Sequence, residues 1–256
     1  MYRGFNLTLD FENDFFYQKG RTLNAANKLT VKRTLDSFIS PDGSINGSKM
    51  QSNWFPQIDA DIFISHSHRD EKMAITLAGW LDEIFGISTF IDSCIWGYSN
   101  DLLRQIDNKH CLNPSGETYS YEKRNNSTSH VHMMLSTALN MMIDKAECLF
   151  FLNTPNSITT KEIISQTESP WIYSEISMSE LISRKKLSEY RPAITRMFSK
   201  GGVINESLKI KYDVYLGHLT KIDADNLNEW ESEWNKIPKE TQFALDLLYK
   251  LNTSIL

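Results

Sequence analysis

The stretch ADIFISHSHRDEKMAITLAGWLDEIFGISTFI, residues 60–91, carries the strongest signal of the fold. It begins with an apolar run at 60–65 that ends in small polar residues, as a buried parallel strand does. A helix is predicted over about 70–85, because apolar residues recur there at intervals of three and four and Gly86 is placed to end it. The run at 87–91 is rich in β-branched and aromatic residues. The stretch therefore predicts a β-α-β unit with two parallel strands and a right-handed crossover.

The segment after this unit predicts two more helices and a further strand. Residues 92–99 are expected to form a loop and residues 100–108 a short helix. Residues 109–128 are rich in turn-forming residues and too long for an ordinary connection, so we interpret them as an insertion. Ser129 is placed to cap the next helix. That helix leads to the apolar run ECLFFL at 147–152, which predicts another buried strand.

The C-terminal half continues the alternation of strands and helices. Ser169 and Pro170 favour a helix start, since Ser is a good cap and Pro fits the first turn. Residues 208–216 alternate in polarity as a strand does, and two helices are expected at about 224–235 and 239–251. This order predicts an α/β fold with an open, mostly parallel sheet flanked by helices, the flavodoxin-like class. Ligands of such sheets bind at the carboxyl ends of the strands.

Residues 1–57 are predicted to form an N-terminal extension. They open with mixed polar and aromatic residues, continue with a helix over about 23–38, and reach a turn-rich loop at 40–47. The character of the sequence changes at Asp59. We therefore expect the main domain to cover residues 58–256.

The composition argues against several classes of protein. The 256 residues include 27 basic and 32 acidic side chains, and a net charge of −5 is not the basic footprint of a nucleic-acid binder. No window reaches the roughly 18 apolar residues of a membrane-spanning helix, and the N-terminus has no apolar signal core. The three cysteines have no disulfide-framework spacing, which favours a reducing compartment. We expect a cytoplasmic protein that binds neither nucleic acid nor a membrane.

Two residues on the helix predicted after ECLFFL suggest a chemistry. Trp171 and Glu175 are four positions apart, so on a helix they share one face. An aromatic ring beside a carboxylate suits a flat cationic group on a sugar, and the nicotinamide of NAD⁺ is such a group. Breaking its ribosyl bond builds positive charge on the sugar, which a fixed carboxylate stabilises. The alternative is an ordinary helix with one core Trp and one solvated Glu.

Residues 61–92 and the sequence SPWIYSEI at 169–176 also resemble a known family. The Ser-His-Ser turn after the first strand, the Phe-Ile-Asp end of the second and the later helix together resemble the TIR (Toll/interleukin receptor) domain, especially its bacterial members. The segment from Trp171 to Glu175 matches the W-x-x-x-E pattern of NAD-cleaving TIR domains. The resemblance covers about residues 58–183. It implies that Glu175 is the central catalytic carboxylate and also hydrogen-bonds the ribose hydroxyls.

The resemblance implies an NAD⁺ glycohydrolase or cyclase. Nicotinamide is released, and water or the substrate's own adenine or ribose accepts the ribosyl group, which gives ADP-ribose or a cyclic ADP-ribose-like signal. NAD⁺ is then a substrate, and no cofactor is expected. The family context implies bacterial antiphage defence, a homo-oligomer and a downstream effector that senses the product. The alternative is a non-catalytic TIR adaptor acting by self-association, and Trp171 with Glu175 distinguishes the two because adaptors often lack them.

Further substrate contacts are expected near the ends of the first two strands. Trp96 and Tyr98 are candidates to stack on a base or on nicotinamide, with loop packing as the alternative. Ser65 and His66 are candidates to hold phosphates, since the sequence has no glycine-rich phosphate loop. Arg69 is another phosphate candidate, with a surface role as the alternative. The predicted substrate-binding residues are Trp171, Ser65, His66, Arg69, Asp92, Trp96, Tyr98 and Ser174.

The histidines raise the question of a metal. Two His-x-His pairs, at 66/68 and 130/132, have spacings that zinc accepts. They form neither a standard finger nor a metalloprotease helix. We therefore expect no metal site.

Overall fold

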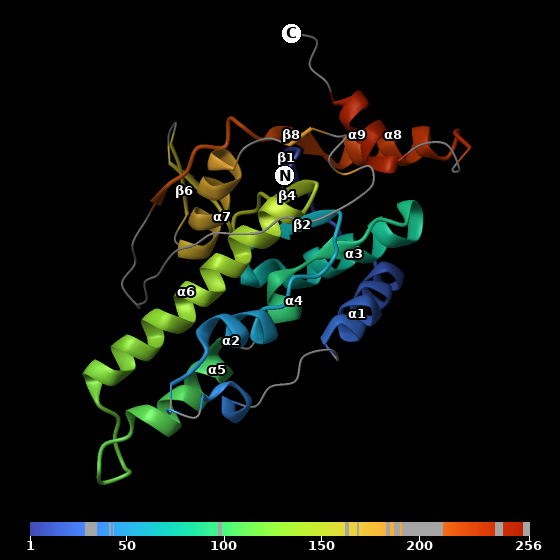
Figure 1. Cartoon of the computed structure of the whole chain (residues 1–256). Coiled ribbons are helices and arrows are strands. Elements are labelled where there is room, and N and C mark those ends of the chain that lie inside the picture. Colours follow the sequence, from blue (N-terminus) through green and yellow to red (C-terminus); the bar gives the residue numbers. More distant parts are fainter. Residues whose placement is uncertain are drawn as a thin grey trace.

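A five-stranded parallel sheet forms the centre of the protein in the computed structural model (Figure 1). Its strands, from one edge to the other, are β3 (Thr89–Phe90), β2 (Ile62–Ser65), β4 (Cys148–Leu152), β1 (Arg3–Thr8) and β8 (Thr220–Asp223). The structure describes residues 1–28, 35–40, 42, 44–96, 99–161, 164–167, 169–182, 185–186, 190, 212–238 and 243–252. The predicted α/β class with an open parallel sheet is confirmed.

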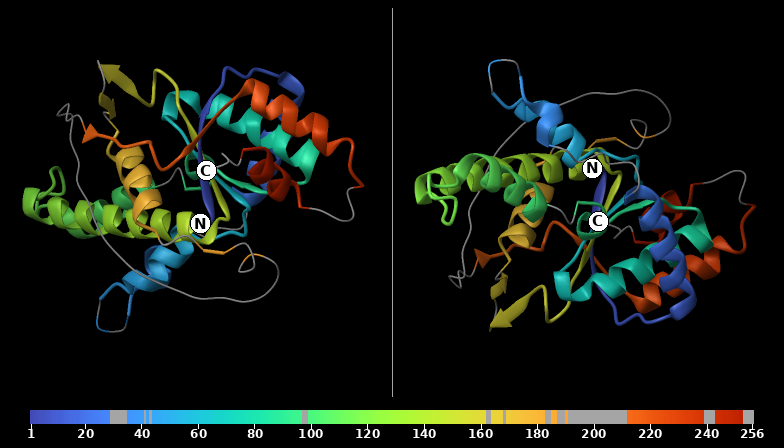
Figure 2. Two further views of the ribbon diagram at one scale, coloured as in Figure 1. Left: turned by 90° about the horizontal axis from the view of Figure 1, so that it is seen from above. Right: turned by 90° about the horizontal axis from the view of Figure 1, so that it is seen from below.

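Helices cover both faces of this sheet (Figure 2). On one side lie α1 (Asp14–Lys28), α3 (Glu71–Phe85) and α8 (Ala224–Trp234), and on the other lie α6 (Tyr121–Lys145) and α7 (Pro170–Leu181). Aromatic rings join α3 to α8, because Phe85 stacks on Trp230 with ring centroids 3.9 Å apart and Trp80 meets the same ring edge-on. The predicted helix at 70–85 and the predicted strands on either side of it are present, although β3 is shorter than predicted.

The N-terminal segment supplies a strand of the main sheet, which corrects the prediction of an extension at residues 1–57. β1 lies between β4 and β8, with Phe5 opposite Phe150 on one side and Thr220 on the other. Phe5 and Leu7 are fully buried. In a flavodoxin-like sheet the strands lie in the order 2-1-3-4-5, and β1 occupies the fourth place of that order. The strand RGFNLT has few apolar residues and its partners are far away in sequence, so local periodicity does not reveal it.

Helix α1 is held against α3 by two glycines. A Cβ atom added at Gly79 would lie 1.9 Å from the carbonyl oxygen of Phe16, and one at Gly20 would lie 2.0 Å from that of Ile75. The backbones of the two helices therefore approach each other closely. α1 begins at Asp14, earlier than the helix predicted at 23–38, and residues 29–34 of that prediction lie outside the described residues.

The predicted insertion at 109–128 is mostly helical. Helix α6 begins at Tyr121, where the side chain of Ser120 caps it by accepting a hydrogen bond from the backbone N–H of Lys123. Ser129, the predicted cap, lies inside the helix. The first turns of α6 have no apolar face and are held instead by buried Asp107, which accepts hydrogen bonds from Ser127 at 2.5 Å and from Arg124 at 2.9 Å. These tertiary contacts explain why periodicity missed the helix start.

Several other elements surround the sheet. Residues 92–99, predicted to be a loop, contain a short helix. Figure 1 shows α5 beside the part of α6 that extends beyond the sheet. The elements not yet given are the helices α2 (Gly47–Trp54), α4 (Asp92–Trp96), α5 (Ser99–Ile106) and α9 (Ala244–Leu251), the 3₁₀ turns η1 (Leu35–Phe38) and η2 (His68–Asp70), and the π-helical turn η3 (Asp107–Cys111).

The C-terminal half departs from prediction in its strands. A small antiparallel sheet contains β5 (Thr159–Lys161), β6 (Ile164–Thr167) and β7 (Tyr212–Asp213). Residues 208–211 of the strand predicted at 208–216 lie outside the described part. Within the described residues 212–216, the strand is β7, which pairs with β6 in the small sheet. α8 matches its prediction, whereas α9 starts later than the predicted residue 239. Within the described ranges, no helix has both the length and the apolar character of a membrane span.

Candidate functional site

The carboxyl end of β2 places a hydroxyl group against a buried carboxyl group. β2 is buried along its whole length, and its last residue, Ser65, is 1% exposed. The Ser65 Oγ donates a hydrogen bond to Oε2 of Glu175 at 2.5 Å. Glu175 comes from α7, 110 residues further along the chain. The contact therefore joins the first predicted motif to the second at the edge of the sheet where ligands of this class of fold bind.

Helix α7 positions Glu175 as the sequence predicts. The Ser169 side chain caps the helix by accepting from the backbone N–H of Ile172, and Pro170 occupies its first turn. The helix turns Ile172 and Ile176 into the core, and Glu175 between them is only 4% exposed. An acidic side chain is rarely buried in this way unless a partner or a function accounts for it.

Burial raises the pKa of Glu175 well above its ordinary value. The main cause is the loss of solvation, which disfavours the charged form, and the negative charge of nearby Asp92 adds to it. The hydrogen bond from Ser65 acts in the opposite direction, because it stabilises the carboxylate. Two acidic groups whose charges oppose each other at one site are typical of a catalytic centre, although structural pairs also occur.

Asp92 and His66 complete this cluster. Asp92 is the first residue of α4 and is separated from the end of β3 by one residue, Ile91. The Nδ1 atom of buried His66 lies 3.8 Å from Oδ1 of Asp92, and its Nε2 atom lies 3.1 Å from Oγ of Ser93. Two consecutive residues at the end of β2 thus face the two carboxyl groups: Ser65, the last residue of the strand, meets Glu175, and His66, the next residue, lies beside Asp92.

Trp171 has a different neighbour. Its half-buried ring meets the ring of His132 on α6 edge-on, with centroids 5.7 Å apart and planes at 83°. Burial lowers the pKa of His132, and its Nδ1 has no hydrogen-bond partner among the described residues. Trp171 therefore lies one helical turn before Glu175 but packs towards α6, whereas Glu175 packs towards β2.

The remaining predicted residues are less involved. Arg69 is exposed in η2, and Ser174 is half-buried on α7. Trp96 ends α4, but its side chain is outside the described part of the structure, as is all of Tyr98. The structure thus brings together Ser65, His66, Asp92 and Glu175, and it leaves the stacking role of Trp96 and Tyr98 as a prediction.

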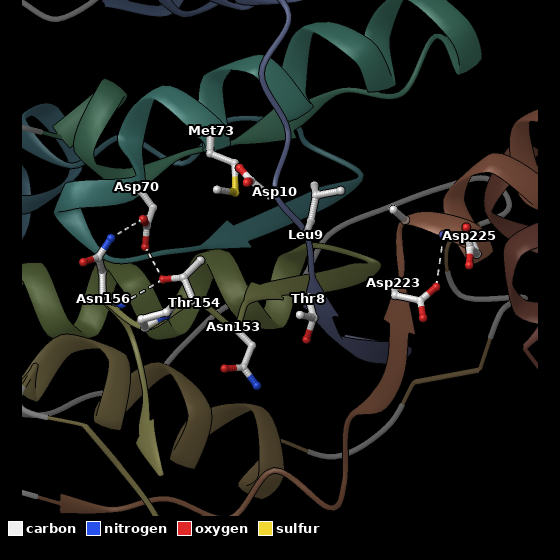
Figure 3. A pocket seen from close by; sticks show the side chains of 12 residues that line it. Thr8, Leu9, Asp10, Asp70, Met73, Asn153, Thr154, Asn156, Asp223 and Asp225 are labelled. Carbon is white, nitrogen blue, oxygen red and sulfur yellow. Dashed lines mark hydrogen bonds between the residues drawn. The ribbon is translucent and has the colours of Figure 1, made fainter.

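A pocket of about 570 Å³ opens at the same edge of the sheet, beside the ends of β1, β4 and β8 (Figure 3). Four aspartates line it: Asp10, Asp70, Asp223 and Asp225. The buried carboxylate of Asp70 accepts hydrogen bonds from Thr154 at 2.5 Å and from Asn156 at 2.7 Å, so it also fixes the loop after β4. The described lining residues do not include Glu175. Sequence reasoning missed this pocket because it missed β1 and β8.

The cysteines and histidines do not add a second centre. All three cysteines are buried thiols outside any disulfide. Within the described ranges, no group of three or more His, Cys, Asp or Glu side chains is arranged to hold a metal ion. Comparisons with protein-family models, with curated proteins and with solved structures found no match to this chain. The sequence motifs and the geometry around Glu175 are therefore the features of this chain that bear on its function.

Proposed function

We propose that this chain cleaves the bond between nicotinamide and ribose in NAD⁺, with Glu175 as the catalytic carboxylate. The observation that carries the proposal is the buried carboxyl of Glu175, hydrogen-bonded by Ser65 at the carboxyl end of β2 and close to Asp92. The resemblance of residues 61–92 and 169–176 to NAD-cleaving TIR domains supports the same assignment.

The buried carboxyl suits a cationic substrate. Burial disfavours the ionised form of the Glu175 carboxyl group, and a positive group that binds beside it favours that form. As the ribosyl bond breaks, positive charge moves from the nicotinamide ring to the sugar and nicotinamide leaves as a neutral molecule. A carboxylate held rigidly beside that sugar stabilises the transition state, and one such contact contributes about 3–4 kcal/mol. The Ser65 hydroxyl orients the carboxylate for this task.

The product depends on which group accepts the ribosyl carbon. Water gives ADP-ribose, whereas the adenine or ribose of the same molecule gives a cyclic product. As part of the proposal, we assign the reaction to bacterial antiphage defence in the cytoplasm, where a downstream effector senses the nucleotide. The motif resemblance supports this context, and the absence of a disulfide-framework spacing supports the reducing compartment.

The experiment is to incubate the purified chain with NAD⁺, quantify released nicotinamide by chromatography and identify the second product by mass spectrometry. The matched variants are Glu175→Gln and Glu180→Gln, which change a buried and an exposed glutamate of the same helix. We expect wild-type and Glu180→Gln protein to release nicotinamide, and Glu175→Gln to be at least about 100-fold slower. A folded Glu175→Gln protein with wild-type turnover would remove Glu175 from the reaction.

A second candidate function is self-association without catalysis. The outer face of α7 favours it, because Leu181 is 76% exposed and Tyr173 is 39% exposed on the helix that carries Glu175. Exposed apolar side chains of this kind are found at contacts between subunits. Light scattering on wild-type protein and on Leu181→Ser measures the molar mass. An adaptor would form oligomers that Leu181→Ser weakens and would release no nicotinamide in any state of assembly.

A further inference from the structure

The sheet places a second carboxyl group beside the Ser65–Glu175 contact. β2 and β3 pair in parallel register, with Ile62 opposite Thr89 and Phe63 opposite Phe90. Two residues further along this register, Ser65 on β2 corresponds to Asp92 at the start of α4. The position of Asp92 next to Ser65 is therefore set by strand pairing.

The buried ring of His66 lies beside the carboxylate of Asp92. Its side chain is 1% exposed, and its ring lies between the backbone oxygen of Ile64, the hydroxyl of Ser93 and the carboxylate of Asp92. Its contacts with Ile64 and Ser93 fix the ring, and the fixed ring lies 3.8 Å from the Asp92 carboxylate, where it limits the positions that this group can take. This is how a second group orients a base in hydrolytic enzymes.

The two carboxyl groups differ in their access to solvent. Glu175 is buried, whereas the side chain of Asp92 remains 30% exposed. Among the described side chains, the ionisable groups that face Asp92 are those of His66, which follows β2, and Glu175 on α7. In glycosidases, two carboxyl groups with different environments take different roles. One stabilises the positive charge on the sugar, and the other exchanges a proton.

We propose that Asp92 is the general base of the reaction, which accepts a proton from the attacking water, and that His66 is the positioning residue that orients it. This inference rests on the proposed NAD⁺ cleavage. It assigns to Asp92 a catalytic role beyond substrate contact.

The step balances with the substrates already named. The bond between C1′ of the ribose and the nicotinamide nitrogen breaks, and its electron pair stays on that nitrogen, which neutralises the pyridinium charge. The water oxygen forms a bond to C1′, and the water proton passes to the Asp92 carboxylate and then to solvent. The products are nicotinamide, ADP-ribose and one proton, and nothing is oxidised or reduced.

The test compares Asp92→Asn with Asp101→Asn, which changes an exposed aspartate on the following helix. Nicotinamide release is measured with and without azide, an anionic nucleophile that needs no base. We expect Asp92→Asn to lower kcat about 100- to 10,000-fold, the usual contribution of a general base, with little change in KM. Azide restores nicotinamide release in Asp92→Asn and forms a ribosyl azide, whereas Asp101→Asn behaves as wild type.

The pH profile separates catalysis from an indirect effect on Glu175. If Asp92 only raised the pKa of Glu175, its removal would move the acid side of the kcat profile to lower pH and leave the plateau rate unchanged. That result would overturn the proposal, as would an inactive Asp92→Asn that azide does not restore. Active wild-type protein with an unaffected Asp92→Asn would refute this inference alone. Inactive wild-type protein would refute the proposed function and the inference together.

His66 is tested by the same rescue. His66→Phe keeps a ring of similar size but removes all three polar contacts of the imidazole. His66→Gln keeps an amide that can meet Asp92. We expect the Phe variant to lose kcat and to recover nicotinamide release with azide, and the Gln variant to retain more activity without azide. A loss in His66→Phe that azide does not restore would show that the residue serves only to hold the structure.

Discussion

Replacing Gly79 by Ala tests how closely α1, the first helix of the N-terminal segment, packs on α3. Gly79 lies on α3 where α1 crosses it, and an added Cβ would lie 1.9 Å from the carbonyl oxygen of Phe16 and 2.8 Å from the amide nitrogen of Gly20. Real Cβ contacts essentially never fall below 3.0 Å, so α1 must move by at least 1.1 Å. The clash is with backbone, and a change of rotamer cannot relieve it.

The expected loss of stability follows from two opposing effects. Overpacking a tight contact costs about 1–3 kcal/mol, and a backbone clash belongs at the upper end of that range. Ala in place of Gly within a helix returns about 1 kcal/mol. We therefore expect Gly79→Ala to lower the free energy of unfolding by about 2 kcal/mol. For a chain of this size that lowers Tm by about 4–8 °C.

The assay is urea unfolding followed by tryptophan fluorescence, since Trp80 lies next to Gly79 and contacts α8. Gly47→Ala on α2 is the control, because its added Cβ would meet only the end of the Met134 side chain, at 3.4 Å. A Gly79→Ala protein as stable as wild type or more so would refute the close packing of α1 on α3.

Two further predictions concern the site and the start of α6. In the unfolded chain Glu175 loses its proton at the ordinary pKa, whereas in the folded chain it does so only at a higher pKa. Between these two pKa values the folded state binds more protons than the unfolded state. The stability of the fold therefore falls as the pH rises through this range. Glu175→Gln should therefore raise Tm at about pH 8. It should not raise Tm at about pH 4, which is near the ordinary pKa of glutamate. Equal shifts of Tm at the two pH values would contradict a buried ionisable group at position 175. Ser120→Ala should lower the free energy of unfolding, measured with a chemical denaturant, by about 1 kcal/mol because it removes the cap of α6. Ser129→Ala should leave it nearly unchanged. A larger loss in Ser129→Ala than in Ser120→Ala would place the helix start where the sequence predicted it.

The parts of the fold that could be predicted are those whose signal is local. The β2-α3-β3 unit combines a continuous apolar strand, a periodic helix and Gly86, which ends the helix in a left-handed conformation. β4 is five consecutive buried residues, and α7 carries both a cap and a first-turn proline. Each of these elements has its evidence within its own sequence.

The parts that were missed depend on distant partners. β8 has a single buried residue, Ile222, and acquires its strand form by pairing with β1. The start of α6 depends on Asp107, which satisfies Ser127 and Arg124 from outside the helix. Neither arrangement leaves a periodic pattern that could be found without the tertiary structure.

The site shows the same division. Glu175 and Ser65 could be named because each is part of a recognisable motif, and the structure places them in contact. The pairing of Trp171 with His132 could not be foreseen, since it depends on how α6 crosses α7. The acidic pocket lies partly on β1 and β8 and was therefore invisible to sequence reasoning.

The most direct measurement is the rate of nicotinamide release from NAD⁺ by wild-type chain and by Glu175→Gln, measured side by side at equal concentrations of folded protein. We predict steady release by the wild type and almost none by the variant, because the amide cannot supply the negative charge that the ribosyl cation needs. Equal rates, or no release by the wild type in any state of assembly, would contradict the assignment of NAD⁺ cleavage to this buried carboxyl group.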